Sequence, residues 1–486
     1  MITGLYFILT ILFLLVAILI LRTNKLNFKK DVKYDYEIES LDTNDIALKF
    51  SQSLQYATIS LKDYFELNKT QFHNFLNYLE STFPLVHSKL KKEVINDYSL
   101  FYTWEGKGKD TNVLLMGHYD VVPVEGSTEG EWIYKPFEGT VSDGFVWGRG
   151  AIDDKAGVVS TLYAVEYLLS KGFETDKTIY LAFGHDEEIG GREGAYQISQ
   201  MLKEKNIKID YVLDEGGAIV SGSNKFVEIP LATVGVAEKG HISIELTSES
   251  SGGHSSMPTK NSSIGMLSRA IVNLEKKQCP PTLNSATKLS LESLIPYIPR
   301  SFKIILSNLW LFWPLLAYHV SSPLIKAMVR TTTAVTMVEA GVKENILPTK
   351  AKAIVNFRII PGNTAEGVFN HTRKIVKNAG VKIEKYGQCW EPSKISGLDN
   401  EGFAILTKTI NQLFPGVPVI PNLVFGATDS RHFLSVSENI YRFRPLIISL
   451  EDMKRVHGIN ERILIVDLVK MVQFYVSLIK NINSVE

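Results

Sequence analysis

Apolar runs in the first half of the chain end in clusters of carboxylate and histidine residues. The run NVLLM precedes His118, TIYLAFG precedes His185, and IDYVL precedes Asp214. Their length and bounded composition are typical of buried strands. Helical periodicity appears between them, over residues 156–169 and 192–205. Strands alternating with helices predict an α/β fold whose mostly parallel sheet is covered by helices.

The hydropathy pattern changes near Ala237. EKGHISIELTS alternates apolar and polar residues, as in a sheet with one solvated face, and TTTAVTMVEAG and AKAIVNFRIIPG are further strands. Helices are predicted over residues 263–274 and 364–378. We therefore expect a smaller α+β domain, residues 237–393, inserted between two parts of the first domain, residues 56–236 and 394–486.

The N-terminus is a nearly continuous apolar run, and ~20 such residues suffice to cross a bilayer as a helix. A cleaved signal peptide is the rival interpretation, but no basic residue precedes Arg22 and no small-residue cleavage pair follows. We expect a single-pass transmembrane anchor over residues 1–22 and a polar linker over residues 23–55.

The side of the membrane is left open by the sequence. Basic residues after the span, Arg22 and Lys25 among them, favour a cytosolic body. The glycosylation sequons at Asn68, Asn261 and Asn370 are meaningful only in a secretory lumen.

The amino-acid composition limits the partners and the metal ligands that this chain can have. With 486 residues, two domains are expected, and the 52 basic and 52 acidic residues leave no net charge. A nucleic-acid binder should carry a basic surplus, so we expect no nucleic-acid partner. Cys279 and Cys389 are the only cysteines, which excludes a thiolate zinc site. A metal must therefore be held by His, Asp and Glu.

The segments GHYDVVP, GRGAIDDKAG and AFGHDEE supply such ligands at strand ends. Two zinc ions that share a bridging carboxylate can clamp a water between them. Asp153 suits the bridge, because it follows a Gly-Arg-Gly turn. His118 and Asp214 would complete one ion, and Glu188 and His457 the other, which leaves each ion an open position.

Two further residues have expected roles beside these ligands. Glu187 should point away from Glu188, which frees it as the general base for the bridging water. Asp120, two residues after His118, can fix the tautomer of that imidazole.

The motifs GHYDVVP, GRGAIDDKAG, GHDEEIGG, GGHSSMP and VHGINE together resemble the zinc aminoacylase and carboxypeptidase family. The resemblance implies two zinc ions per subunit, a catalytic domain interrupted by a lid or dimerisation domain, and a cis bond between Asp153 and Asp154. It also implies that His254 stabilises the oxyanion, in several members from the partner subunit of a homodimer. Candidate substrate-binding residues are Asn345, Arg358 and Arg431.

The expected activity is hydrolysis, or the reverse condensation, of the amide bond in N-acyl amino acids. The apolar stretch over residues 291–320, with Trp310, favours long acyl chains if it borders the active site; core packing or a dimer contact are its alternatives. A carboxypeptidase or dipeptidase acting on small peptides is the alternative function. A non-catalytic binding protein should have lost Glu187 or a ligand, and neither is lost.

Overall fold

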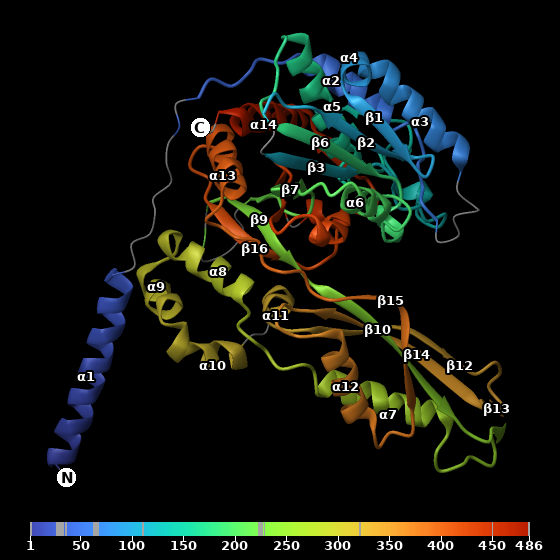
Figure 1. Cartoon of the computed structure of the whole chain (residues 1–486). Helices are drawn as coiled ribbons and strands as arrows, with labels where there is room; N and C mark the ends of the chain where they lie inside the picture. Colours follow the sequence, from blue (N-terminus) through green and yellow to red (C-terminus); the bar gives the residue numbers. More distant parts are fainter. Residues whose placement is uncertain are drawn as a thin grey trace. The chain divides into compact units, whose positions relative to one another are not determined.

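The computed structural model describes residues 2–25, 34, 36–61, 68–108, 111–221, 227, 229–319, 322–449 and 451–484 (Figure 1). The chain forms two compact units. The large unit comprises Lys29–Val236, Ser396–Pro421 and Thr428–Glu486, and the small unit comprises Met1–Phe28, Ala237–Ile395 and Asn422–Ala427.

A mixed sheet forms the core of the large unit, with the strand order β1-β2-β6-β3-β7-β17-β9-β8-β18 and β16 beside β9. At its centre β3 runs parallel to β6 and β7, and β7 runs parallel to β17, as the alternating pattern predicted. The strands are β1 Lys91–Ile95, β2 Ser99–Trp104, β3 Asn112–His118, β6 Thr178–Gly184, β7 Tyr211–Asp214, β8 Ile219–Val220, β9 Leu231–Glu238, β16 Val419–Val424, β17 Ile440–Arg442 and β18 Ile447–Ile448. A second sheet has the order β19-β5-β4, from Arg462–Leu464, Phe145–Trp147 and Thr140–Ser142.

Helices cover this sheet (Figure 1). They are α2 Thr43–Ser53, α3 Lys69–Thr82, α4 Pro84–Lys89, α5 Lys155–Ser170, α6 Ala195–Glu204, α13 Glu401–Leu413 and α14 Ile465–Asn483. The helix predicted over residues 156–169 is α5, which packs against β3 and α14. Its Val158, Leu162 and Val165 are fully buried, so α5 fixes the end of the sheet from which the metal-ligand candidates project.

The linker expected over residues 23–55 contains a helix, which corrects that expectation. Asp42 caps α2 by accepting hydrogen bonds from the backbone N–H groups of Asn44 and Asp45, at 3.0 and 3.1 Å. Ile46 and Phe50 of α2 are buried. A polar, Lys- and Asp-rich segment therefore belongs to the folded body, because one narrow apolar stripe suffices to dock a short helix.

An antiparallel sheet with the order β12-β14-β10-β15 forms the centre of the small unit. Its strands are β10 Gly240–Glu249, β12 Thr332–Ala340, β14 Lys350–Ile359 and β15 Lys382–Trp390, and the short pair β11 Gly253–His254 and β13 Ile346–Leu347 lies apart. Helices α7 Ser263–Lys276 and α12 Ala365–Val376 share a buried apolar core with β10 and β14. The other helices of this unit are α1 Ile2–Lys25, α8 Ser285–Leu294, α9 Arg300–Ser307, α10 Leu309–His319 and α11 Pro323–Val329.

Candidate metal centre

The end of β3 presents a histidine whose ring is held in one orientation. His118 is the last residue of β3, and its Nδ1 lies 3.1 Å from the backbone oxygen of Asp120. A carbonyl oxygen can only accept, so Nδ1 donates and Nε2 is left with its lone pair for a metal. The carboxylate of Asp120 lies 3.3 Å from the same Nδ1, which reinforces this tautomer.

Asp120 also ties three segments together. Its carboxylate accepts hydrogen bonds from the backbone N–H groups of Glu187 and Glu188, each at 3.1 Å, and from the Ser60 hydroxyl at 2.7 Å. Asp120 is completely buried. The expected role of Asp120 in orienting His118 therefore extends to the turn that carries both glutamates.

That turn begins two residues after β6, which ends at Gly184 opposite His118. Gly191 closes the turn with a φ of 65°, and a Cβ at this position would lie 2.0 Å from Oδ1 of Asp429. Glycine is needed here for both reasons. His185 faces away from the ligands: its Nδ1 lies 2.6 Å from the Ser99 hydroxyl, and burial lowers its pKa to about 4.

The ligand candidates form two groups, each with donor atoms within 4.8 Å of one another. One group contains His118, Glu187 and Glu215, and the other contains Asp153, Glu188 and His457. Imidazole and carboxylate donors in groups of three are the set that catalytic zinc accepts, so the residues present fit a pair of metal ions.

Asp153 joins the two groups. Its Oδ1 lies 3.0 Å from His118 Nε2, and its Oδ2 lies 3.0 Å from His457 Nε2, which is also 3.1 Å from Glu188. The peptide bond from Asp153 to Asp154 is cis, as the resemblance implied. One carboxylate that presents one oxygen to each histidine has the geometry of a bridging ligand.

Asp214, the last residue of β7, is bonded to a segment outside the two groups. Its Oδ2 accepts a hydrogen bond from the backbone N–H of Ser430 at 2.9 Å, and Asp214 belongs to neither group. The next residue, Glu215, lies 3.9 Å from His118 Nε2. The ligand role of Asp214 stays a prediction, and Glu215 is the better candidate.

Burial and mutual repulsion give the cluster strongly perturbed acidities. Burial raises the pKa of Glu187 and of Glu215 well above the usual range, and neighbouring carboxylates add to the effect. For Asp153, burial is outweighed by hydrogen bonds from His118 and His457, which hold its pKa low. So many buried acids need cations nearby, which is a second reason to expect metal ions.

These motifs identify a known family. The chain matches the family described as Peptidase family M20/M25/M40 over residues 114–481. The chain belongs to this family. The family predicted from the motifs is therefore confirmed, together with a mixed α/β fold and a hydrolase of amide or peptide bonds.

The relatives cover almost the whole chain. It is 38% identical to "Probable carboxypeptidase S-like 2" of Dictyostelium discoideum, over 91% of this chain and 86% of the relative. It is 36% identical to "N-fatty-acyl-amino acid synthase/hydrolase PM20D1" of Xenopus tropicalis, over 97% and 94%. The crystal structure of an M20 family metallo-carboxypeptidase from Sulfolobus solfataricus superposes with a TM-score of 0.68 at 20% identity, covering 92% of this chain and all of that one.

Two residues that sequence analysis missed lie around this M20 centre. Glu461 is buried and accepts hydrogen bonds from the N–H groups of Ile152 and Asp153, at 2.7 and 3.2 Å. Asp429 is also buried, and neither of its carboxylate oxygens has a hydrogen-bond partner among the described residues. Glu461 is the last residue of the motif VHGINE, and Asp429 lies in the segment GATDSRHF, residues 426–433. No rule of residue spacing assigns either of them a partner.

Arg431 lies beside Glu187, the candidate general base. Its Nη1 is 4.0 Å from Glu187 Oε1, and its guanidinium donates to the backbone oxygens of Thr428 and Gly190, at 2.8 and 2.6 Å. These bonds hold Arg431 beside Glu187. From there its positive charge can act on the Glu187 carboxylate as well as on a bound substrate.

The remaining candidates belong to the small unit. His254 is exposed in β11 and its Nδ1 lies 2.7 Å from the Ser256 hydroxyl. Asn345 is close by in the chain fold, because its backbone oxygen accepts a hydrogen bond from the backbone N–H of Ser255 at 3.1 Å. Arg358 lies in β14, paired with His241 of β10. The roles of His254, Asn345 and Arg358 stay predictions.

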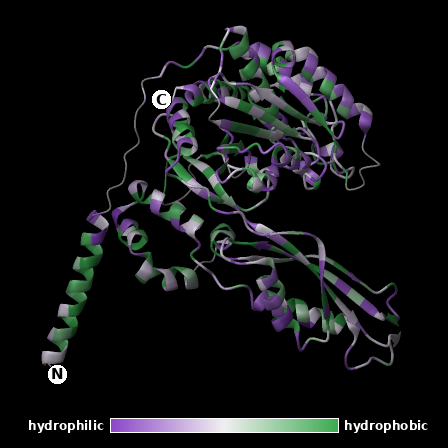
Figure 2. Ribbon diagram, in the orientation of Figure 1, coloured by the Kyte–Doolittle hydropathy of each residue, from purple (hydrophilic) through white to green (hydrophobic). Residues whose placement is uncertain are grey.

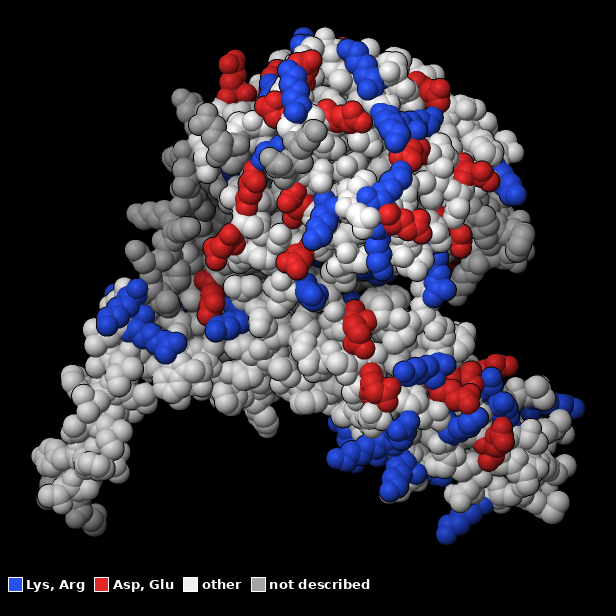
Figure 3. Space-filling model, in the orientation of Figure 1, with Lys and Arg blue, Asp and Glu red and all other residues white. Residues whose placement is uncertain are grey.

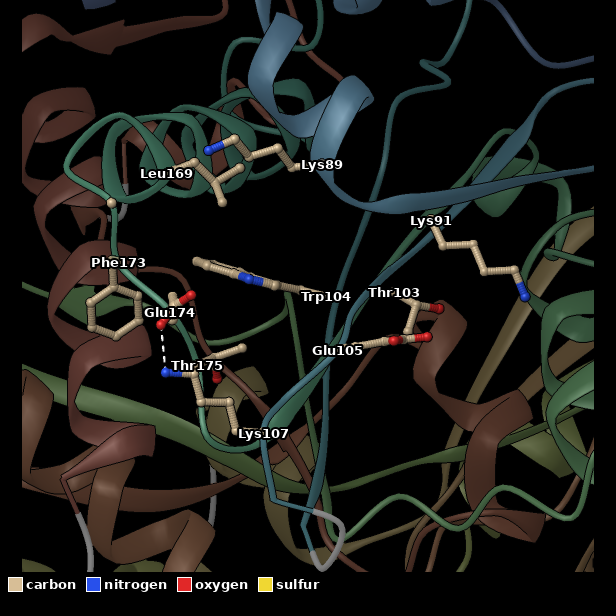
Figure 4. Close-up of a pocket in the computed structure, with 11 residues that line it drawn as sticks. Lys89, Lys91, Thr103, Trp104, Glu105, Lys107, Leu169, Phe173, Glu174 and Thr175 are labelled. Carbon is tan, nitrogen blue, oxygen red and sulfur yellow. Dashed lines mark ion pairs between the residues drawn. The ribbon is translucent and has the colours of Figure 1, made fainter.

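A pocket elsewhere in the large unit is separate from this chemistry (Figure 4). It lies among Lys89, Trp104 and Phe173, and an ion pair of 2.5 Å joins Lys107 to Glu174 at its wall. None of the metal-ligand candidates lines it.

Glu461 offers a test of how the metal-bearing turn is held. It forms a buried ion pair of 2.8 Å with Arg149, so Glu461→Gln leaves that charge buried without a counter-ion. We expect the free energy of unfolding to fall by about 3–5 kcal/mol and metal affinity to fall roughly 10–100-fold. The control is the exposed ion pair of Lys135 and Glu138, which are 3.4 Å apart. Glu138→Gln should change neither the free energy of unfolding nor the metal affinity by much. Denaturant unfolding and metal titration measure the two quantities, and equal effects of both variants would contradict the assignment.

The neighbours Asp214 and Glu215 give a second test. We expect Glu215→Gln to lower the metal content from two ions per chain to about one, because it removes a charged ligand. Asp214→Asn should keep both ions, because an amide oxygen still accepts the Ser430 N–H. Elemental analysis of the purified variants decides between them. Loss of metal in Asp214→Asn alone would restore the ligand expected from the sequence.

Lys239 predicts a pH dependence of stability. Burial, with help from the nearby charge of Arg358, lowers its pKa to about 7. Between pH 7 and the ordinary lysine pKa of about 10.4 the unfolded chain holds a proton that the folded chain has lost. Stability should therefore rise with pH in this window, by at most about 1.4 kcal/mol per unit, and Lys239→Met should abolish that rise. Thermal unfolding from pH 6 to 9.5 measures this rise in stability. Lys135→Met, at an exposed site, is the control. Parallel stability curves for the wild type and Lys239→Met would contradict the prediction.

Proposed function

We propose that the chain is a di-zinc amidohydrolase that cleaves, and can form, the amide bond of N-fatty-acyl amino acids. The observation that carries the proposal is the position of Asp153, whose two oxygens face His118 and His457 at 3.0 Å each. This geometry suits two metal ions that share the Asp153 carboxylate as a bridging ligand.

The residues of the site have distinct tasks in this reaction. Two zinc ions, when bound, would polarise the substrate carbonyl and make an attacking water acidic. Glu187 takes the proton of that water and later gives it to the leaving nitrogen. Its burial suits the first step, because a raised pKa makes the Glu187 carboxylate a stronger base. Arg431, 4.0 Å away, can offset the negative charge that Glu187 carries before the first step and again after the second.

The substrate class rests on the relatives and on the small unit. A relative named as an N-fatty-acyl-amino acid synthase/hydrolase is 36% identical over nearly the whole chain. Arg358, whose charge acts on Lys239, offers a cationic group for the carboxylate of the amino-acid half. The runner-up is a carboxypeptidase, favoured by the relative named carboxypeptidase S-like.

A series of N-acyl phenylalanines separates the two functions. Acyl chains from acetyl to oleoyl would be compared with dipeptides and with the matching amides that lack the carboxylate. We expect kcat/KM to rise steeply with chain length, since each buried methylene contributes up to about 0.8 kcal/mol. The amides should be poor substrates. Flat dependence on chain length with faster cleavage of dipeptides would favour the carboxypeptidase.

We also propose a homodimer in which His254 serves the partner subunit's site. Support comes from the exposed edge strand β12, where Met337 and Val338 are 58% and 62% exposed, since an open apolar edge invites pairing. Mixing two inactive variants, His254→Ala and Glu187→Ala, should restore part of the activity in mixed dimers. Mixed dimers without activity would argue for a histidine that acts within its own chain.

We propose that α1 is a retained anchor and not a cleaved signal. The helix is long and apolar enough to span a bilayer. Asn308 Nδ2 donates to the backbone oxygen of Leu19 at 3.3 Å, and Leu19 is 7% exposed whereas Ile18 is 54% exposed. A helix that packs on the folded body is expected to stay with it. Mass spectrometry of the membrane-extracted chain tests this, because cleavage would remove the N-terminal peptide.

A further inference from the structure

The helices α9 and α10 form a sharply bent, apolar segment, which we call the elbow (residues 300–319). The two helices meet at an angle of 102°, and together they are apolar enough for a broken span or a re-entrant loop. Asn308 forms the bend, and α10 carries no charged side chain.

The elbow exposes large apolar side chains. Trp310 is 56% exposed, Leu315 57% and Tyr318 84%. Two residues of α11, the next helix along the chain, are also exposed: Leu324 by 53% and Ile325 by 45%. A soluble surface rarely gathers so many apolar side chains on adjacent helices, so this surface is expected to have an occupant.

The elbow is docked on the N-terminal helix. Asn308 Nδ2 lies 3.3 Å from the Leu19 oxygen and 3.4 Å from the Thr23 hydroxyl oxygen. Figure 2 shows hydrophobic residues along α1 and through α9 and α10, and Figure 3 shows basic side chains near the C-terminal end of α1. The last turn of α1 contains two basic residues, Arg22 and Lys25.

This docking position fixes the depth of the elbow relative to α1. Basic side chains at the end of a span lie at the headgroups. Leu19 precedes Arg22 by three residues, and at 1.5 Å per residue it lies about 4.5 Å further into the hydrocarbon. An element in contact with Leu19 is therefore at the boundary between headgroups and acyl chains, the depth at which amphipathic interfacial helices bind.

The composition of the elbow suits that depth. Trp310, Trp313 and Tyr318 are residues that concentrate at membrane interfaces, since their rings are amphipathic. Lys303 and Arg300 lie on α9, where charged groups can reach the headgroups. We propose that the elbow inserts into the interfacial layer of the leaflet in which α1 ends, and that its occupant is the lipid bilayer.

This inference rests on the proposed anchor, and the two can be tested separately. The full-length chain would be reconstituted into phosphatidylcholine vesicles that contain lipids doxyl-labelled at a shallow or a deep acyl position. Tryptophan quenching should be stronger with the shallow label. Trp310→Phe with Trp313→Phe should lower that quenching at least threefold, because the four other tryptophans remain as background.

A control reports the effect of tethering alone. Val272, 43% exposed on α7, would be changed to Trp in the double Phe variant, and its quenching should stay at the background level. Equal quenching of the wild type and the double Phe variant would overturn the elbow proposal. Crosslinks between copies through Leu315→Cys, with no lipid quenching, would overturn it in favour of a protein interface. Release of the whole chain by alkaline carbonate would instead overturn the anchor.

Discussion

Changing Glu187 to Gln is expected to abolish turnover while both metal ions stay bound. The amide keeps the size of the side chain but cannot take the proton of the attacking water. Loss of a general base costs roughly 10²–10⁴-fold in kcat, and more where the same group also returns the proton to the leaving nitrogen. We therefore expect kcat to fall by at least about 10³-fold, measured with the best N-acyl amino acid and paired with metal analysis.

Metal content is the decisive measurement in this test, because the donor atoms of Glu187, His118 and Glu215 lie close enough together to bind one ion. If Glu187 were a ligand, the variant would lose an ion as well as activity. Glu193→Gln makes the same chemical change at an exposed position near the same turn and should leave both quantities unchanged. Near-normal turnover in Glu187→Gln would show that another group is the base.

Changing Asp153 to Asn should remove both ions at once. The amide has one oxygen, so it cannot face both histidines, and it carries no charge to balance two divalent cations. We expect less than one tenth of the wild-type metal content and no measurable turnover. A chelator should lower the melting temperature of the wild type, since bound metal stabilises the folded state, but it should leave that of Asp153→Asn unchanged.

The matched control is Asp143→Asn. Asp143 lies in a turn with a φ of 54°, a conformation that Asn also adopts readily. It should retain metal, activity and the response to chelator. Retention of one full ion by Asp153→Asn would mean that Asp153 binds a single metal and bridges nothing.

The sequence by itself determined the parallel centre of the sheet and most of the metal-ligand candidates. Strands and helices follow from local periodicity, and parallel strands must end at the same edge. His118 and Glu188 therefore had to come close together, because they follow the adjacent parallel strands β3 and β6. Asp153 follows β5 of the second sheet, so this rule did not fix its position. His457 was added by resemblance, because the segment that carries it comes from the far end of the chain.

Only the tertiary structure decided the finer assignments. Asp214 and Glu215 are adjacent at the end of β7, and a strand that passes into a loop no longer alternates its side chains predictably. Glu461 holds a turn some three hundred residues earlier in the chain, a contact that no local pattern encodes. The docking of Asn308 on Leu19 is of the same kind. Local propensity depends on neighbours in sequence, whereas these roles depend on which distant groups the packing of the core brings within hydrogen-bond distance.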